Sequence, residues 1–341
     1  MNGALPLLWV LLAAAIDRLL GDPQGWLHPV QVMGAAIEGL RRPLERLAGD
    51  SPLLLRLAGL LITLVVVGAS LLCGWGLERL AVRQPWLGLP LLLLGLASAL
   101  AGRSLADAVR AVLAALEPEG PLEPARQRLA WIVGRDTEAL DADGILRAAA
   151  ETAAENAVDG LFAPLFWMLL GAGLVSLVPG APGPLALAWA FKAASTLDSM
   201  LGYRRGRLCW LGTAGARLDD LLTWMPCRLV ALTLPLAAGR AAETPQLLRL
   251  ALLDGAPDPS PNAGVSQAAY AHAAGIRLGG LNHYAGQARL KPLLAGHCPP
   301  PDREAVTRML RLSDRLELLW LSPAAALLTW ELIRALPMAA Q

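Results

Sequence analysis

The stretch Ile145–Trp167, ILRAAAETAAENAVDGLFAPLFW, decides how the rest of the chain is interpreted. Its alanines favour a helix, and it carries Glu151, Glu155 and Asp159 at intervals of four. Residues four apart share one face of a helix, so the carboxylates form an acidic stripe about 12 Å long. Gly160 predicts the end of this helix, which places Asp159 at the negative end of the helix dipole. We therefore expect a cation or an arginine from outside the helix to compensate Asp159, unless the stripe is only a solvated face.

The composition is that of a membrane protein. Hydrophobic residues make up 55% of the 341 residues and charged residues only 17%, whereas soluble domains carry about 25% charged residues. The net charge of +1 gives no basic field for nucleic acid. The four cysteines are dispersed without CxxC spacing, which favours packed thiols over a zinc site or a disulfide framework.

Apolar runs suitable for crossing a bilayer recur along the chain. Almost no segment alternates at the period of a strand, so we predict an all-α fold, a polytopic membrane helical bundle with cytoplasmic helical loops. The whole chain, 1–341, is predicted to form one membrane-embedded domain. The candidate spans are 5–20, 53–73, 86–101, 161–178, 184–200, 221–238 and 316–338.

The distribution of Lys and Arg predicts the orientation. The run Tyr203-Arg204-Arg205-Gly206-Arg207 indicates a cytoplasmic loop, and the uncharged connection 179–183 an external one. We expect the protein in the cell (inner) membrane with its active site facing the cytoplasm. Segment 221–238 contains Pro226 and Arg228, so it either spans fully or is re-entrant, and the side of loop 239–315 stays open.

Clusters of polar residues lie at the ends of the apolar segments. Ionisable groups are energetically costly there unless they pair with other groups or serve a function. Arginine binds phosphate through paired hydrogen bonds, and carboxylates bind Mg²⁺ together with substrate oxygens. The arginines and carboxylates of these clusters therefore suit a substrate that carries phosphate. Each also has a plainer interpretation: His28 could cap a turn, Asp219 and Asp220 could cap a helix, and Ser260–Gly264 could be a turn. No GxxxxGK[ST] loop or GxGxxG motif is present, so a nucleotide would bind in another way.

In this order, the clusters resemble those of the CobD/CbiB family, the adenosylcobinamide-phosphate synthases of cobalamin biosynthesis. The matching stretches are GDP…HPVQVMG (21–34), GRDT (134–137), ETAAENAVDGLFAPLFW (151–167), STLDSMLGYR (195–204), ARLDD (216–220), MPCR (225–228), and SPNAG with RLGGLNHYAG (260–264 and 277–286). They cover most of the chain between about residues 14 and 290. The chain departs at Ser195, where the family usually has Asn; Ser keeps a hydrogen-bonding group there.

The resemblance implies an acid–amine ligase. It would join the free propionate carboxylate of adenosylcobyric acid to (R)-1-aminopropan-2-ol phosphate, or to aminopropanol, giving adenosylcobinamide phosphate. A carboxylate and an ammonium do not condense at neutral pH, so ATP would activate the acid as an acyl phosphate, Mg²⁺ would offset the phosphate charge and a base would free the amine. Implied partners are the corrinoid, aminopropanol phosphate and membrane lipid; homo-oligomerisation and association with other corrinoid-pathway membrane enzymes stay open.

We expect the charged groups to meet in one water-accessible pocket at the cytoplasmic edge of the bilayer. The hypothesis assigns catalysis to Glu151, Glu155, Asp198 and His28; substrate or phosphate binding to Arg135, Lys192, Arg204, Arg217, Asn262 and Asn156; and metal binding to Asp159, Asp219 and Asp220.

Two other classes of function remain open. A membrane-embedded Mg²⁺-dependent prenyl- or phospho-transferase would carry two Asp-rich motifs on paired helices, but this chain offers only Asn156–Asp159 and Asp219-Asp220. A transporter would show internal pseudo-symmetry, yet no motif occurs twice.

Overall fold

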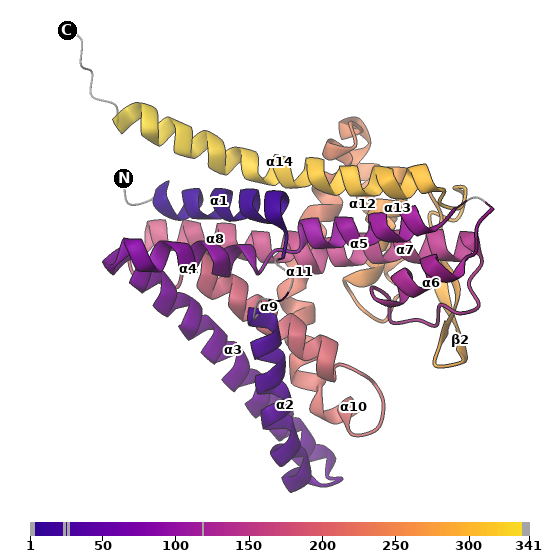
Figure 1. Ribbon diagram of the computed structural model, residues 1–341, viewed down its shortest axis with the longest axis horizontal. Helices are drawn as coiled ribbons and strands as arrows, with labels where there is room; N and C mark the ends of the chain where they lie inside the picture. Colours follow the sequence, from indigo (N-terminus) through magenta and orange to yellow (C-terminus); the bar gives the residue numbers. More distant parts are fainter. Residues whose placement is uncertain (1–3, 23–24, 26–27, 118, 336–341) are drawn as a thin grey trace. The chain divides into compact units, whose positions relative to one another are not determined.

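The computed structural model describes residues 4–22, 25, 28–117 and 119–335 (Figure 1). Most of them are helical. They form two compact units, each containing several segments of the chain. The first unit comprises Met1–Ala101, Ala163–Leu222 and Leu321–Gln341, and the second Gly102–Phe162 and Thr223–Trp320.

The first unit is helical. Its elements are α1 (Ala4–Leu20), α2 (Pro29–Ala48), α3 (Pro52–Arg83), α4 (Pro85–Ala97), α8 (Ala163–Leu177), α9 (Pro184–Leu201), α10 (Leu208–Leu211) and the first part of α11 (Thr213–Ala237). A core of buried apolar residues lies between α2, α3, α9 and α10, with Ile37, Ile62 and Leu197 fully enclosed. The helices approach closely: a Cβ on Gly74 of α3 would lie 2.8 Å from Cα of Ala186 in α9. Small residues at such contacts are typical of helices packed in a membrane.

The second unit surrounds α7 (Ala142–Ala157) and the almost wholly buried α13 (Ala263–Ala274). Its other elements are α5 (Gly102–Ala115), α6 (Glu123–Ala130), the 3₁₀ turn η2 (Ala241–Glu243), α12 (Thr244–Gly255), strands β1 (Leu278–Tyr284) and β2 (Gln287–Leu294), and the first part of α14 (Arg303–Ala335). Tyr270 of α13 is fully buried, and its hydroxyl lies 2.6 Å from Oγ of Ser313. This contact fixes α13 against α14.

The acidic helix does not end at Gly160. Helix α7 continues through a π-helical turn, η1 (Val158–Phe162), into α8, and Figure 1 shows the uninterrupted ribbon. The wider turn interrupts the regular hydrogen-bond ladder, which accommodates Pro164 because proline has no N–H to contribute. Asp159 therefore lies inside a continuous helix, and the predicted helix end was wrong.

The prediction of a purely helical chain needs one correction, since β1 and β2 form an antiparallel hairpin. The pairing is irregular between Leu278 and Gly280, and Gly279, Gly280 and Gly286 have φ values of 84°, 95° and 75°. These glycines interrupt the alternation of polar and apolar residues that would mark strands in the sequence.

The membrane prediction is supported for part of the chain. In the described residues, Pro52–Arg83 and Ala142–Leu177 are long and apolar enough to cross a bilayer, and Pro85–Ala97 with Gly102–Ala115 makes a third if the bent pair is one span. Leu57, Leu61 and Leu64 of α3 are exposed, as lipid-facing side chains are. Each of the seven candidate spans is mostly helical where described, although α4 ends at Ala97, four residues before the predicted end of its span; 336–338 of the last span and Pro23 of the first family-like stretch lie outside the described residues.

Candidate functional site

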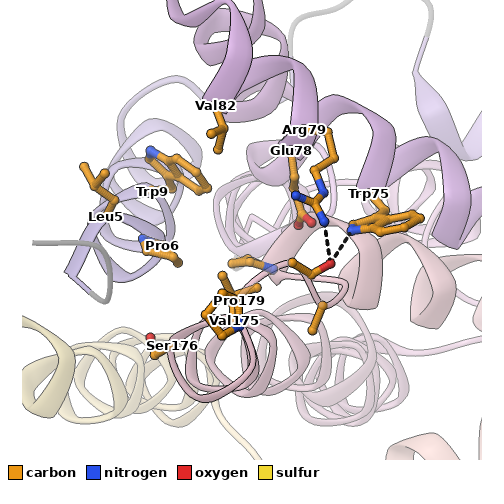
Figure 2. A pocket seen from close by; sticks show the side chains of 13 residues that line it. Leu5, Pro6, Trp9, Trp75, Glu78, Arg79, Val82, Val175, Ser176 and Pro179 are labelled. Carbon is orange, nitrogen blue, oxygen red and sulfur yellow. Dashed lines mark hydrogen bonds between the residues drawn. The ribbon is translucent and has the colours of Figure 1, made fainter.

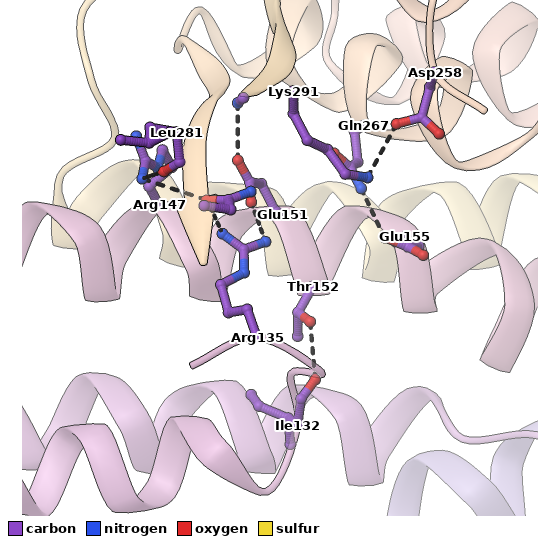
Figure 3. A network of polar contacts seen from close by, with 12 residues as sticks. Ile132, Arg135, Arg147, Glu151, Thr152, Glu155, Asp258, Gln267, Leu281 and Lys291 are labelled. Atoms are coloured by element: carbon purple, nitrogen blue, oxygen red, sulfur yellow. Dashed lines mark hydrogen bonds and ion pairs between the residues drawn. The ribbon is translucent and has the colours of Figure 1, made fainter. Parts of the chain in front are cut away.

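The first carboxylate of the stripe is buried in the second unit and fully occupied by protein partners (Figure 3). Glu151 is 1% exposed. Its Oε2 pairs with a guanidinium nitrogen of Arg135, and its Oε1 accepts the backbone N–H of Gly279 at 2.8 Å. The interpretation of a solvated face is therefore wrong for Glu151, whose buried carboxylate forms an ion pair with Arg135.

A second arginine joins this network. Arg135 donates from Nη1 to Oδ1 of Asn282 at 2.8 Å, and Arg147 reaches the same oxygen from Nη2 at 3.5 Å. Arg147 also donates to the carbonyl of Leu281 at 2.9 Å, which ties α7 to strand β1. Asn282 is 2% exposed, so one buried amide oxygen receives both cations.

The hairpin is shaped to make these contacts. A Cβ on Gly279 would lie 1.9 Å from the carbonyl oxygen of Pro292, so only glycine fits where the backbone turns toward Glu151. At the other end of the hairpin, the carboxylate of Asp136 accepts the N–H groups of Ala285 and Gly286 at 3.0 and 2.7 Å. Glu151 of α7 thereby holds the start of strand β1, and Asp136 of the GRDT stretch holds the turn that follows its end.

Glu155 belongs to a neighbouring network on the next turn of α7 (Figure 3). Its Oε2 accepts from Nε2 of Gln267 at 2.7 Å, and Nζ of Lys291 pairs with Asp258 at 3.0 Å. Burial disfavours the charged form of Lys291, but Asp258, together with Glu155 and Tyr284, outweighs the effect of burial and holds the Lys291 pKa above its usual value. Glu155 thus lies beside a charged lysine, in a second set of contacts between α7, α13 and the hairpin.

The predicted substrate residue Asn262 is mostly buried and supports structure. Its Oδ1 accepts from Nη1 of Arg228 at 2.5 Å, and Arg228 also donates to the carbonyl of Pro261 at 2.8 Å. The MPCR and SPNAG stretches meet through these bonds. Asn156 and Asp159, also in the second unit, are partly buried.

The first unit holds a separate cluster of charged groups from α9 and α11. Asp219 is flanked by Asp198, Asp220 and Lys192, close enough for their charges to act on it. Burial, reinforced by the two neighbouring carboxylates, raises the pKa of Asp219 to about 7. Its Oδ1 is buried and has no hydrogen-bond partner among the described residues. The site predicted around this Asp pair therefore contains a carboxylate that takes up or releases a proton near neutral pH.

The cations predicted in the first unit differ in position. Arg204 is exposed and lowers the pKa of Asp220, although burial raises that pKa overall. Arg217 is exposed and has no hydrogen bond or ion pair with another described residue. Of the three, Lys192 and Arg204 act on the carboxylate cluster.

His28 caps helix α2. Its Nδ1 accepts the N–H of Val30 at 3.3 Å, Gln31 completes a capping box, and Nε2 lies 3.4 Å from Asp22. The capping interpretation is confirmed, while a role in catalysis stays a prediction.

The acidic residues do not assemble into a metal cluster. Within the described part of the chain, no three His, Cys, Asp or Glu side chains come together in a way that could hold a metal ion. The predicted ligand Asp159 lies in the second unit, and Asp219 and Asp220 in the first. Convergence of all the predicted groups in one pocket stays a prediction.

A polar pocket of about 840 Å³ opens beside the Glu151 network. Its walls are the loop 135–141, the first turns of α7 and the hairpin, with Arg135, Arg147 and His283 among the lining side chains.

Comparison with known proteins identifies the family. The model of the family described as CobD/Cbib protein matches residues 10–313. The Synechocystis protein named cobalamin biosynthesis protein CobD is 41% identical over 97% of this chain and 92% of its own length. The Salmonella arizonae protein named cobalamin biosynthesis protein CbiB is 40% identical over 90% of this chain and 92% of its own. The chain belongs to the CobD/CbiB family. No solved structure matches it.

The CobD/CbiB stretches divide between the units. In the second unit, GRDT, the acidic helix and RLGGLNHYAG meet around Glu151, and MPCR meets SPNAG. In the first unit, STLDSMLGYR and ARLDD meet around Asp219. Sequence reasoning missed Arg147, Gln267, Asn282 and Lys291. Arg147 could have been found, since it lies four residues before Glu151 on the same helix face.

The CobD/CbiB chain also has a mostly apolar pocket of about 300 Å³ in its first unit (Figure 2). Trp75 and Arg79, on its wall, both donate to the carbonyl of Gly180, at 3.2 and 2.8 Å. Glu78 accepts the N–H groups of Gly183, Leu185 and Ala186 at 2.7–3.2 Å, which satisfies the start of α9. This buried carboxylate, which sequence reasoning missed, therefore has a structural role.

Proposed function

We propose that this CobD/CbiB protein is the enzyme of cobalamin biosynthesis that forms an amide between the propionate carboxylate of adenosylcobyric acid and (R)-1-aminopropan-2-ol phosphate, or aminopropanol. Membership of the family and the printed names of its relatives support the pathway. The chemistry needs an activated carboxylate, with ATP as cosubstrate, and a base for the amine.

The observation that carries the proposal is the environment of Asp219. A general base for an ammonium works best when its pKa is near the working pH, and burial beside Asp198 and Asp220 brings Asp219 to about 7. Its unpartnered Oδ1 leaves an acceptor for the amine proton. Lys192 and Arg204 supply positive charge for the phosphoryl groups of the substrates.

The same residues fit a Mg²⁺ ion better than the acidic stripe does. Both oxygens of Glu151 are occupied. Mg²⁺ uses only one or two protein carboxylates beside substrate phosphate oxygens, which Asp198 and Asp220, the neighbours of Asp219, can provide while Asp219 serves as the base. When bound, the ion would offset the charge on transferred phosphoryl oxygens. We assign to the Glu151 network the task of fixing the hairpin against α7.

The proposal places the protein in the inner membrane as a multi-pass chain, with its site on the cytoplasmic side. The apolar helices Pro52–Arg83 and Ala142–Leu177 and the basic run 203–207 support this. Labelling of introduced cysteines in intact cells with a membrane-impermeant thiol reagent tests this orientation. A Cys at position 205 should be labelled only after the cells are permeabilised, whereas a Cys at position 182 should be labelled in intact cells.

The purified protein in detergent tests the reaction, given adenosylcobyric acid, aminopropanol phosphate and ATP with Mg²⁺. We expect a new corrinoid product, which Asp219→Asn and Glu155→Gln abolish while the control Asp143→Asn, on an exposed position of α7, retains it. Full activity in both variants would refute the site assignment. Transfer of a prenyl or phosphoryl group without an amide product would favour the transferase. Movement of the corrinoid across vesicle membranes without chemical change would favour the transporter.

A further inference from the structure

The polar pocket of the second unit is lined by charges of both signs. Its charged lining residues are the arginines Arg135 and Arg147 and the carboxylates Asp136, Glu138 and Asp141. The carboxylates outnumber the arginines by one, so the lining does not match a phosphoryl group or another anion. A neutral ligand that carries both hydrogen-bond donors and acceptors matches it better.

Hydrogen-bonding capacity of both kinds is left over around this pocket. Nε of Arg147 is buried and has no acceptor among the described residues, although Nη2 of the same side chain donates to the carbonyl of Leu281 at 2.9 Å. Oδ1 of Asp141 accepts the N–H of Gly144 at 2.8 Å, and the carboxylate of Glu138 is exposed at the pocket. The lining therefore has a buried donor that needs an acceptor, beside carboxylates that can accept. A primary carboxamide supplies both an acceptor and donors from one small neutral group.

An ammonium group would match only part of this lining. It has three donors and no acceptor, so it cannot satisfy the buried Nε of Arg147, and an unsatisfied buried donor is costly. The pocket is also large for a small amine. Its volume is about 840 Å³, compared with about 300 and 400 Å³ for two mostly apolar pockets of the first unit. This size favours a ligand at the large end of the small-molecule range.

An exposed apolar face of the hairpin continues from the pocket wall. Leu281 lines the pocket and is 51% exposed, and its cross-strand partner Leu290 is 82% exposed. Directly opposed residues of an antiparallel pair project to the same face of the sheet, so these leucines form one apolar surface. Figure 3 shows Leu281 next to Arg147. The ligand that fits therefore has a large apolar body edged with polar, uncharged groups.

We propose that this pocket and the Leu281–Leu290 face bind the corrinoid substrate through the carboxamides at the edge of its macrocycle. Arg147 donates to a carboxamide oxygen, the carboxylates of Asp141 and Glu138 accept from carboxamide N–H groups, and the two leucines contact the apolar macrocycle. This inference rests on the proposed function for the identity of the ligand, because a corrinoid is a large macrocycle whose side chains end in neutral primary amides.

Binding of dicyanocobinamide, a neutral corrinoid with these amides, tests the site without requiring turnover. The full-length protein in detergent should bind it in equilibrium dialysis, with the corrinoid quantified by its visible absorbance. Arg147→Met should weaken binding at least about tenfold, because the ligand loses the buried donor. The control Arg249→Gln, at an exposed arginine of α12, should leave the affinity unchanged. No binding by the wild type, or unchanged affinity in Arg147→Met, would overturn the proposal.

Leu290→Gln provides a second variant, which leaves the arginines untouched. The side chain is exposed, so the fold should tolerate the change, while the loss of apolar contact should weaken corrinoid binding at least about threefold. The matched control is Leu253→Gln, because Leu253 of α12 is also exposed, at 58%, and lies in the same unit. Equal affinities of the two variants would refute the contact between Leu290 and the macrocycle.

Salt and competition separate this ligand from charged ones. The affinity for the neutral corrinoid should change by less than about threefold between low and high salt, because screening acts on net charges. A steep loss of affinity with salt would contradict recognition of neutral amides. Displacement of dicyanocobinamide by 1-aminopropan-2-ol would assign the pocket to the amine and overturn the proposal.

Two results distinguish this inference from the proposed function. Binding of dicyanocobinamide that needs Arg147, with no amide product formed by the wild type, would keep the corrinoid site and refute the proposed reaction. Amide formation by the wild type, with corrinoid binding indifferent to Arg147 and Leu290, would keep the proposed reaction and overturn this site.

Discussion

Removing the charge of Glu151 should destabilise the second unit strongly. The variant Glu151→Gln keeps an acceptor for the N–H of Gly279 but leaves Arg135 without its carboxylate. Breaking one partner of a buried ion pair costs about 3–5 kcal/mol, because the remaining charge stays desolvated. We expect the lower part of that range, about 3 kcal/mol, which corresponds to about 150-fold in the unfolding equilibrium.

The assay is reversible unfolding of the purified protein by SDS in mixed micelles, followed by far-UV circular dichroism. The matched control is Glu304→Gln, which breaks the exposed pair with Arg308, whose nitrogen and oxygen lie 3.7 Å apart; exposed pairs contribute about 0–1 kcal/mol. The double variant Arg135→Gln/Glu151→Gln should recover part of the lost stability, since it removes the buried guanidinium that Glu151→Gln leaves without its carboxylate. If Glu151→Gln lowers the free energy of unfolding no more than Glu304→Gln does, Arg135 and Glu151 do not form a buried, coupled pair.

The remaining predictions concern pH and the hairpin. Because burial raises the folded-state pKa of Asp219 from 3.8 to about 7, the contribution of this group to stability is complete below pH 3.8 and is lost as pH rises to 7. Asp219→Asn should therefore flatten the fall in melting temperature between about pH 4 and 7, and an unchanged slope would contradict the raised pKa. Gly279→Ala should lower the free energy of unfolding by more than about 2 kcal/mol, because the new Cβ would lie 1.9 Å from the carbonyl oxygen of Pro292 at a φ of +84°. Gly296→Ala is the control and should change thermal unfolding little, because its Cβ would lie 3.8 Å from its nearest neighbour.

The sequence predicted the helices and the polar motifs better than it predicted what the motifs contact. Apolar runs long enough to be helical are a property of each segment alone, and every candidate span is mostly helical where described, with α4 ending four residues before the predicted limit of its span. The hairpin was missed because Gly279 and Gly280 replace alternating side chains with backbone at positive φ. The end of the acidic helix was misplaced because a π-helical turn absorbs Gly160, and that choice depends on packing around the turn, not on glycine itself.

For the candidate site, spacing predicted that Glu151 belongs to a row of carboxylates on one helix face, but it could not identify Arg135 as the partner of Glu151. The partner lies in a loop that precedes the helix, and its position depends on Asn282 in a hairpin more than a hundred residues later. The same limit hid Lys291, whose neighbour Asp258 comes from the loop after α12. Contacts between distant segments follow from the fold, and one sequence contains no direct signal for them.

Glu151 and Asp219 look alike in sequence, since each is a carboxylate in a polar stretch beside an apolar helix. Their surroundings give them opposite capacities. Glu151 has an arginine and a backbone donor on its two oxygens, so its acceptors are used and its charge is balanced. Asp219 has like charges beside it and an unused oxygen, so a proton or a cation is what it lacks. A saturated carboxylate stabilises the fold, whereas an unsaturated one can exchange protons with a substrate; Asp219 of α11 is therefore a better candidate for the catalytic base than Glu151.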